Sequence, residues 1–184
     1  MNEDAPLTGL IQAAMGGDRE AGDEVMRLVY DELKRLAHGI RRGAGETLST
    51  EALVHEAWLK LAPAQGVSIE SRVHFRHLAA RAMRQIVLDE ARSRYAQKRG
   101  GDVRPVTLDE ALDGEMPSDP VAVLTFDGAL EELQTVDARA AQVVECRVFG
   151  GMEVGETAQA LEVSTATVKR DFRFARAFLA ERLS

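Results

Sequence analysis

The stretch GMEVGETAQALEVSTATVKRDFRFARAFLAERL, residues 151–183, decides the fold of this chain. It contains two amphipathic segments, residues 153–161 and 164–183, which are joined by the short turn Glu162-Val163-Ser164. Apolar residues recur in the second segment at the spacing of one helical face, and such a stripe packs against a core. The pattern therefore predicts a helix-turn-helix. The apolar stripe consists of Val168, Phe172, Ala175 and Leu179.

The other face of this second helix is rich in cations and hydroxyl groups. Ser164 or Thr165 is placed to cap the helix, because its side-chain oxygen can accept a backbone N–H that has no partner in the first turn. A helix of this kind can enter the major groove of DNA with its back on the core. A basic face that is merely solvated is the alternative interpretation. The candidate contacts with duplex DNA are Ser164, Thr165, Thr167, Lys169, Arg170, Arg173 and Arg176.

The composition favours an all-α protein without a membrane segment. The 184 residues are 45% hydrophobic but only 5% aromatic, and they include five prolines. This is enough for one large or two small domains. No apolar run approaches the roughly 20 residues needed to cross a bilayer, and the acidic N-terminus does not have the pattern of a signal peptide. The single cysteine, Cys146, fits a buried thiol in a reducing compartment, so we expect a cytoplasmic protein.

The net charge of −7 hides two basic patches. Residues 72–99 contain eight Lys and Arg against two acids, and residues 164–184 contain five against two. Between them, residues 100–135 contain one Arg and nine acids. Attraction to phosphate is local, because charges more than about 10 Å apart are largely screened at moderate salt. The negative total therefore does not exclude nucleic acid as a partner.

Helical periodicity is strong on both sides of a segment that has little of it. We expect helices near residues 7–15, 18–42, 50–61 and 75–97, and again from about 124 and from 137. Asp18, Ser49 and Asp137 are placed to cap three of them. Residues 100–124 are rich in acids and hold three of the five prolines, as in a flexible linker. The sequence thus predicts two small helical domains, residues 1–99 and 125–184, joined by an acidic linker, residues 100–124.

Three stretches together resemble a known family. LVHEAWLKL at 53–61, HFRHLAARAMRQIVLDEARSR at 74–94 and the helix-turn-helix follow one another as in the sigma-70 family of sigma factors. The resemblance is to the extracytoplasmic function (ECF) group, and AQKRGG at 96–101 is similar to an atypical branch of it. It implies that residues 1–99 form a region 2-like domain and residues 125–184 a region 4-like domain.

This resemblance implies a function in transcription initiation, with no cofactor, metal or catalytic residue of the protein's own. Such a factor binds core RNA polymerase at the β′ clamp coiled coil and the β flap, and some bind an anti-sigma factor. The C-terminal helix-turn-helix would read the −35 element of promoter DNA. Residues 74–94 would read the −10 element and stabilise the melted strand, which requires cations for phosphates and a pocket for an unstacked base. The candidates there are His74, Arg76, Arg81, Arg84, Gln85, Arg92 and Arg94, with the loop 65–74 for base capture.

The polymerase-docking helix departs from the family pattern. Ser49 and Ala52 are neutral where the family commonly has acids, although two nearby glutamates remain. A phosphate would add negative charge at a helix N-terminus, where anions are favoured. We therefore hypothesise that a Ser/Thr kinase phosphorylates Thr50 or Ser49; a plain helix cap is the alternative. The candidate polymerase contacts are Glu51, Val54, His55, Glu56, Trp58 and Leu59.

Two other acidic positions bear on DNA binding. Asp171 stands in the recognition helix where the family frequently has a cation. We hypothesise that the negative charge of the linker acids Asp109, Glu110 and Asp113 screens the two basic patches from free DNA before polymerase binds. We expect their neutralisation to raise the affinity for DNA in the absence of polymerase.

Two alternative functions are kept open. A helix-turn-helix repressor or activator acting without polymerase would form a dimer and bind operator half-sites about one helical turn apart. That class has no use for the second basic helix. An enzyme is the other alternative, because His74-x-x-His77, His55 and Cys146 contain metal-ligand types. No second spaced ligand motif, phosphate-binding loop or nucleophile motif accompanies them, so we interpret these histidines as surface residues.

Overall fold

The computed structural model describes residues 4–44, 49–61, 72–97 and 119–183, and every regular element in those ranges is a helix. The all-α expectation is therefore confirmed. None of the helices in these ranges is both long enough and apolar enough to cross a membrane. The predicted base-capture loop and most of the acidic linker, including Asp109, Glu110 and Asp113, lie outside the described residues.

The N-terminal half consists of α1 (Asp4–Met15), α2 (Arg19–Ala44), α3 (Thr50–Leu61) and α4 (Arg72–Gln97). Gly17 has a φ of 96°, which a residue with a side chain rarely adopts, and it allows the chain to turn sharply between α1 and α2. Two predicted caps are present: the backbone N–H of Ala21 donates to Asp18, and that of Ala52 donates to Ser49, each at 3.1 Å. Helix boundaries in this half follow local capping chemistry.

The C-terminal half consists of α6 (Pro120–Val136), α7 (Ala138–Val144), η1 (Glu145–Phe149), α8 (Val154–Ala160) and α9 (Thr165–Leu183). Helix α6 begins earlier than expected, so residues 120–124 are helical and do not belong to a linker. Asp119 caps this helix, and a proline suits its first position because its missing N–H would have no partner there. The buried side chain of Val123 anchors this first turn in the core.

The predicted helix from residue 137 to 149 is divided into two kinds of helix. It begins as the α-helix α7, capped by Asp137, and continues as the π-helix η1. The backbone N–H of Gly150 donates to the carbonyl oxygen of Glu145, five residues earlier, at 3.1 Å. Short π-helices are uncommon and often mark functional positions. Here the π-helix buries Glu145 together with its apolar neighbours.

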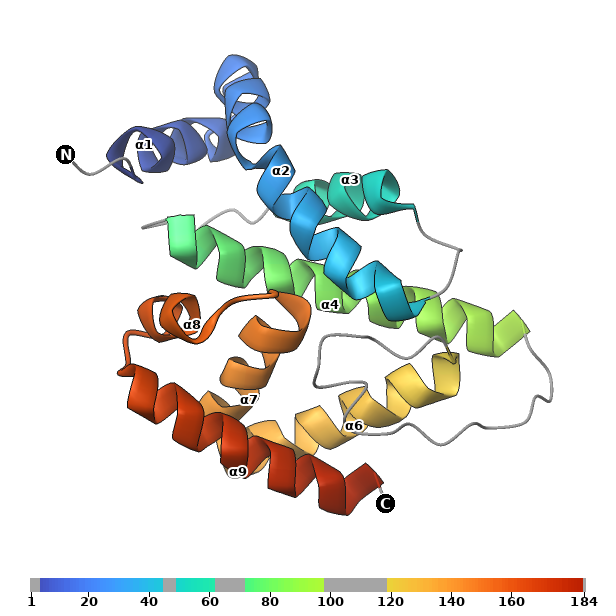
Figure 1. Cartoon of the computed structure of the whole chain (residues 1–184). Coiled ribbons are helices and arrows are strands. Elements are labelled where there is room, and N and C mark those ends of the chain that lie inside the picture. Colours follow the sequence, from blue (N-terminus) through green and yellow to red (C-terminus); the bar gives the residue numbers. More distant parts are fainter. Residues whose placement is uncertain (1–3, 45–48, 62–71, 98–118, 184) are drawn as a thin grey trace.

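Helix α4 lies at the centre of the molecule (Figure 1). It runs between α2 and α3 on one side and α6, α7 and α8 on the other. Buried residues of both halves form one apolar cluster, which includes Leu33, Phe75, Met83, Phe126 and Phe149. The sequence predicted two domains but did not predict that they share a core. Because α4 is covered on two sides, Ala80, Met83 and Leu88 are buried in addition to residues such as Phe75 and Ile86.

We predict that Gly150→Ala destabilises the fold at the contact between the two halves. A Cβ atom at this position would lie 2.4 Å from the carbonyl oxygen of Cys146 and 3.1 Å from the Cβ of Ala80. Both neighbours are held by helix packing, so we expect urea denaturation to show a loss of about 1–3 kcal/mol.

Gly128→Ala is the matched control, because Gly128 is an exposed residue inside α6 and a methyl group added there would meet nothing within 4 Å. It should stabilise the protein by about 0.5–1 kcal/mol, since alanine loses less backbone entropy in a helix. Equal stability of Gly150→Ala and the wild type would show that the close approach is not a real constraint.

Candidate nucleic-acid interface

The helix-turn-helix is fixed by its turn and by a small apolar cluster. Glu162 in the turn has a left-handed backbone with φ 54°, and the N–H of Val163 donates to the carbonyl of Ala158 at 2.9 Å. Ser164 caps α9, because its hydroxyl accepts the N–H of Thr167 at 3.1 Å, which confirms Ser164 over Thr165 as the cap. The apolar cluster of Val143, Ala158 and Val168 joins α7, α8 and α9. The outer face of α9 is thus presented by a rigid support.

The predicted duplex contacts share this outer face of α9. Val168, Ala175 and Leu179 are buried on the opposite side of the helix, as the sequence predicted. Thr167 is half-buried, and its hydroxyl lies 2.9 Å from that of Ser164, so it supports the cap. The exposed residues of the set are Ser164, Thr165, Lys169, Arg170, Arg173 and Arg176.

Asp171 has a structural position in the recognition helix. Its side chain is buried and accepts from Arg139 Nε at 2.6 Å and from Arg170 Nε at 3.1 Å. The hydrogen bond from Arg139, assisted by that from Arg170, holds the pKa of Asp171 below its ordinary value, although burial opposes the shift. Asp171 therefore fastens α9 to α7 and partly neutralises Arg170, instead of facing DNA.

The basic residues predicted on α4 divide into two groups. Arg81, Gln85 and Arg92 are exposed, whereas the side chains of Arg76 and Arg84 are only 15% and 14% exposed. His74 and Arg94 are half-buried. The structure therefore brings only part of the predicted set to the surface. The buried arginines point to the C-terminal half of the chain, where acids receive them.

Arg84 is bound between two buried carboxylates. Its Nε and Nη2 donate to Asp127 on α6 at 2.8 and 2.6 Å, and its Nη1 donates to Glu145 on η1 at 3.1 Å. Burial lowers the pKa of Arg84, but the two acids outweigh that effect and raise it. Burial likewise raises the pKa of Glu145, and His77 and Arg84 beside it outweigh this and lower it. Arg84 and Glu145 thus hold each other in their charged forms.

Arg76 forms another ion pair between the halves, in addition to those of Arg84 and the longer one from Arg81 Nε to Glu145 at 4.0 Å. Both of its terminal nitrogens donate to the carboxylate of Glu156 on α8. The same carboxylate accepts the backbone N–H of Glu153 at 2.8 Å and so caps α8. One glutamate therefore joins the first helix of the helix-turn-helix to α4. The guanidinium also lies 3.8 Å from Glu32 on α2.

The outer end of α4 has its own small polar cluster around Asp89. This carboxylate accepts from Gln85 at 2.9 Å and lies 3.3 Å from Lys60 and 3.5 Å from Arg92. All of these side chains are substantially exposed. Pairs of this kind are weak in water, so phosphate can compete for Arg92 and Lys60.

The acids that bind α4, and the arginine that binds Asp171, were not predicted from the sequence. Asp127 lies in the apolar run VAVLTFDGAL and Glu145 in AAQVVECRVF. An acid inside an apolar helical run is rarely buried without a cationic partner, and this is a signal that sequence reading can use. Glu156 and Arg139 have no comparable signal, because neither lies inside a long apolar run: Glu156 stands between Gly155 and Thr157, and Arg139 follows Asp137 in the first turn of its helix.

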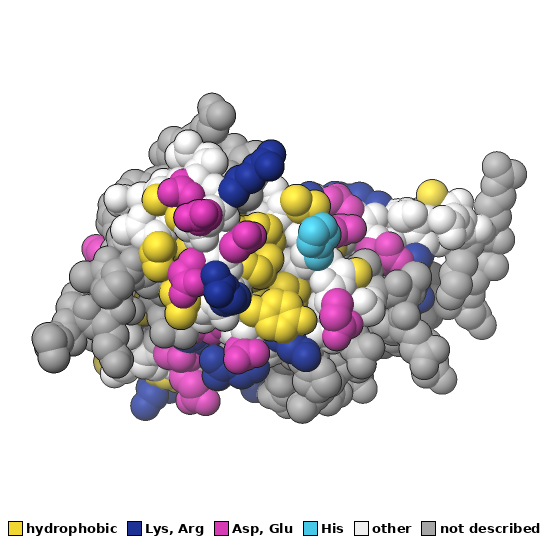
Figure 2. All heavy atoms as spheres, turned by 90° about the horizontal axis from the view of Figure 1, so that it is seen from above, with side chains coloured by type: hydrophobic (Ala, Val, Ile, Leu, Met, Phe, Trp, Pro, Cys, Tyr) yellow, Lys and Arg dark blue, Asp and Glu magenta, His cyan; other side chains and the backbone are white. Residues whose placement is uncertain are grey.

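Helix α3 presents an acidic row. Figure 2, which views the molecule from above, shows acidic side chains beside hydrophobic ones on that face. Glu51, His55 and Glu56 are exposed, and Leu59 is 53% exposed. Val54 is 2% exposed, so this predicted contact instead belongs to the core. Of the two predicted phosphorylation sites, Ser49 is exposed and caps α3, whereas Thr50 is buried.

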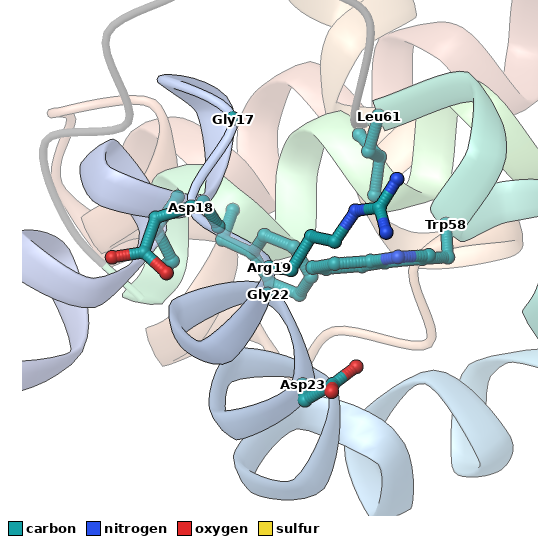
Figure 3. Close-up of a pocket in the computed structure, with 10 residues that line it drawn as sticks. Gly17, Asp18, Arg19, Gly22, Asp23, Trp58 and Leu61 are labelled. Atoms are coloured by element: carbon teal, nitrogen blue, oxygen red, sulfur yellow. The ribbon is translucent and has the colours of Figure 1, made fainter.

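The half-buried Trp58 borders a cavity of about 340 Å³. Residues of α1, α2, α3 and α4 line it, with apolar side chains such as Phe75 and Ile11 among them. Figure 3 shows the side chain of Arg19 and the indole of Trp58 extending toward one another, while Asp18 and Asp23 point elsewhere. Within the described residues, no group of three His, Cys, Asp or Glu side chains is arranged to hold a metal.

A known protein family matches nearly the whole chain. The sequence model of the family described as ECF sigma factor matches residues 4–184. The matched range includes α3, the basic helix α4 and the helix-turn-helix of α8 and α9. No curated protein matches the chain.

We predict that Asp171→Asn destabilises the protein in a pH-dependent way. The pKa of Asp171 is lowered in the folded state, so its contribution is complete above the unfolded pKa of about 3.9 and is lost as the pH falls toward the folded pKa. At pH 7 the substitution should cost about 1–3 kcal/mol, as for a lost hydrogen bond to a charged group.

The measurement is urea denaturation between pH 7 and pH 3, with Glu181→Gln on the exposed side of α9 as the control. The difference from the wild type should shrink below about pH 4, because Asp171 then binds a proton in the unfolded chain while it is still charged in the folded protein. A difference that is the same at both ends of this range would contradict the assigned ion pair.

Proposed function

This chain belongs to the ECF sigma factor family, and from that premise we propose which surfaces contact polymerase and promoter. Members bind core RNA polymerase and direct promoter-specific transcription initiation, and they are transcription factors rather than enzymes. The observation that carries the proposal is the combination, in one chain, of a rigidly supported cationic helix-turn-helix and an acidic row on α3.

Helix α9 reads the −35 element in this proposal. Lys169 and Arg173 are exposed on the face opposite the buried stripe, and neither forms an ion pair within the described residues. They are therefore available for phosphates or guanine edges in the major groove. The hydroxyls of Ser164 and Thr165 lie at the N-terminus of α9, where backbone N–H groups also favour a phosphate.

Helix α4 reads the −10 element and holds the melted strand. Arg81 and Arg92 are exposed and can neutralise phosphates, and Gln85 offers an amide to a base. Arg76 and Arg84 extend the same cationic helix once their carboxylate partners are displaced. Stabilising a single strand requires cations along its phosphates but no covalent chemistry, so this role needs no catalytic residue.

Helix α3 docks on the β′ clamp coiled coil, and the C-terminal half contacts the β flap. The exposed row of Glu51, His55, Glu56 and Leu59 combines negative charge with an apolar side chain, which suits a helical partner that carries arginines. Phosphorylation of Ser49 would add charge at the N-terminus of this row. Thr50 is 7% exposed, so a kinase would need local opening of α3 to reach it.

A helix-turn-helix regulator acting without polymerase is the alternative mode of action. It would leave the acidic row on α3 and the basic helix α4 without a role. A chain that binds duplex DNA tightly as a dimer and does not bind core polymerase would favour this alternative. A measurement of binding to core polymerase therefore distinguishes the two modes of action.

We predict that Arg173→Ala weakens binding to −35 duplex DNA by about 1–3 kcal/mol, the range for a good base contact. Fluorescence anisotropy with matched and altered −35 sequences separates the two kinds of contact. If Arg173 contacts a base, the variant should lose its preference for the matched sequence. If Arg173 contacts a phosphate, the variant should bind both sequences less tightly, and the slope of log affinity against log salt concentration should fall by about one.

Arg182→Ala is the control on the same helix. Arg182 is paired with Glu132 at 2.8 Å, and nine residues of α-helix place it on the side opposite Arg173. Its removal should leave DNA affinity unchanged. Unchanged affinity of Arg173→Ala would exclude this face of α9 from DNA binding.

We predict that Glu56→Lys lowers the affinity for core bacterial RNA polymerase at least tenfold, because it reverses a charge in the docking row. Ala52→Asp should raise the affinity, since it adds an exposed acid in the first turn of α3. Glu131→Lys, an equal charge reversal on the exposed side of α6, is the control. Co-elution and titration with labelled core polymerase measure the effect, and a Glu56→Lys variant that binds like the wild type would exclude this row.

A further inference from the structure

Helix α9, which the structure describes over its whole length, leaves one large apolar side chain exposed. This residue is Phe174, and it is 43% exposed. Phe172 and Phe178 on the same helix are half-buried and pack against the apolar cluster that both halves share. Single exposed apolar residues are common on protein surfaces, so the position of Phe174 on the helix decides its meaning.

Phe174 lies among the cations that the recognition helix presents to solvent. Arg170, Arg173, Phe174 and Ala177 are all exposed, and they follow one another at i, i+3, i+4 and i+7. Residues at these intervals share one side of a helix, and we call these four residues the outer strip of α9. The recognition helix of a homeodomain reads the major groove with residues at the same spacing. The ring therefore lies where a helix in the major groove meets base edges.

A second aromatic residue holds the ring of Phe174 in place. The centroids of the Phe174 and Phe178 rings are 6.4 Å apart, and the ring planes are inclined by 41°. Aromatic rings at such a distance attract each other. Phe178 is itself fixed, because it packs on the core and the guanidinium of Arg182 lies 4.6 Å from its ring centroid. The ring of Phe174 is thus preorganised, which reduces the entropy that a contact with it would cost.

The chemistry of a phenyl ring restricts what it can recognise on DNA. Phenylalanine has no side-chain donor or acceptor, so it cannot read the hydrogen-bonding groups of a base. The bases present one apolar group in the major groove, the C5-methyl group of thymine, and apolar side chains such as phenylalanine contact it. Packing of this methyl group on the ring removes apolar surface of both groups from water.

The neighbours of Phe174 favour DNA over a protein with an apolar surface as the partner of this strip. Such a protein would bury Arg170 and Arg173 beside the ring, and a buried cation without a partner is costly. DNA supplies phosphates and guanine edges to the two arginines at the same time as a methyl group to the ring. The mixed character of the outer strip therefore matches a major groove.

We propose that Phe174 is a specificity-determining residue that reads the C5-methyl group of a thymine in the −35 element. The inference rests on the proposed function, because it takes α9 as the helix that lies in the major groove of that element. It adds a base preference, a thymine at one position of the element beside the contacts of Arg170 and Arg173. The cations of the helix do not by themselves predict such a preference.

The experiment removes one methyl group at a time from the DNA. The full chain is assembled with core bacterial RNA polymerase, and a matched −35 sequence is selected from duplexes that are randomised in this region. Each thymine of the selected element is then replaced singly by deoxyuridine, which lacks the C5-methyl group but forms the same base pair. Competition binding gives the ratio of the affinities for the thymine and deoxyuridine duplexes at each position.

For the wild type we expect one position at which deoxyuridine lowers the affinity about fourfold, which corresponds to about 0.8 kcal/mol for one buried methyl-sized group. Phe174→Ala should bind the thymine duplex at least fourfold more weakly than the wild type does. It should no longer distinguish thymine from deoxyuridine at that position. Phe174→Leu keeps an apolar side chain and should retain part of the discrimination.

Val136→Ala is the matched control, because Val136 is also an apolar side chain of the C-terminal half and is 61% exposed at the end of α6. This variant should keep the affinity and the thymine preference of the wild type. A change in its preference equal to that of Phe174→Ala would overturn the assignment, since the effect would then not depend on the outer strip.

Three further results would overturn the inference. The first is a wild type that binds every deoxyuridine duplex as tightly as the thymine duplex. The second is a Phe174→Ala variant that weakens binding to both duplexes by the same factor, because the ring would then support the helix without reading a base. The third is a Phe174→Ala variant that loses affinity for core polymerase but keeps the thymine preference, which would assign the ring to a protein contact.

Arg173→Ala and Lys169→Ala are measured in parallel, so that failure of the inference can be distinguished from failure of the proposed function. If Arg173→Ala weakens binding to the −35 element while Phe174→Ala keeps the thymine preference, α9 remains the reading helix and only the methyl contact is overturned. If none of the three substitutions changes −35 affinity, the proposed function of α9 is overturned and the inference with it.

Discussion

The burial of Arg84 between Asp127 and Glu145 is the constraint on which the arrangement of the molecule depends. A guanidinium that is 14% exposed requires acceptors, and the only two acids in contact with it within the described residues come from the other half of the chain. The ion pairs therefore determine which side of α4 faces the C-terminal half. The close approach of Gly150 to Ala80 follows the same alignment. Together they fix the position of the helix-turn-helix relative to the basic helix.

Helix α4 serves both halves, and this explains its unusual composition. One side packs on α2 and α3 through apolar residues such as Phe75, and another meets α6, η1 and α8 through Ala80, Met83 and the arginines. A helix that belonged to a separate N-terminal domain would expose this second side. Small residues and long cations on this side suit the contact, because alanine allows the close approach of Gly150 and the arginines reach the carboxylates on either side.

Much of the fold follows from local sequence. The caps Asp18, Ser49, Asp137 and Ser164 were predicted from their chemistry, since an oxygen at these positions satisfies a free N–H. The recognition helix was predicted from its apolar stripe. The start of α6 was missed because Asp119 and Pro120 resemble a loop until the buried turn behind them is known.

The pairing of the halves could not be predicted in this way. Glu156 and Arg76 are 80 residues apart, and neither residue type signals a particular partner. Arg84 was predicted as a DNA contact from its charge and from the family resemblance of residues 74–94, and its burial depends on the packing of α4 against α6. Asp171 was expected to bear on DNA binding, because it stands where the family frequently has a cation and the sequence does not show that it points inward to Arg139. Long-range ion pairs require the tertiary structure.

Chemical modification of individual arginines tests the central claim most directly. Phenylglyoxal, followed by mass spectrometry, reports how accessible each guanidinium is in the free protein, with core polymerase, and with polymerase and promoter DNA. We expect Arg84 to be protected in the free protein while the exposed Arg81 and Arg92 react, and we expect polymerase to make Arg84 reactive and promoter DNA to protect it again. If Arg84 reacts as fast as Arg81 in the free protein, it is not held between the two carboxylates, and if it stays protected when polymerase binds, it does not contact the melted strand.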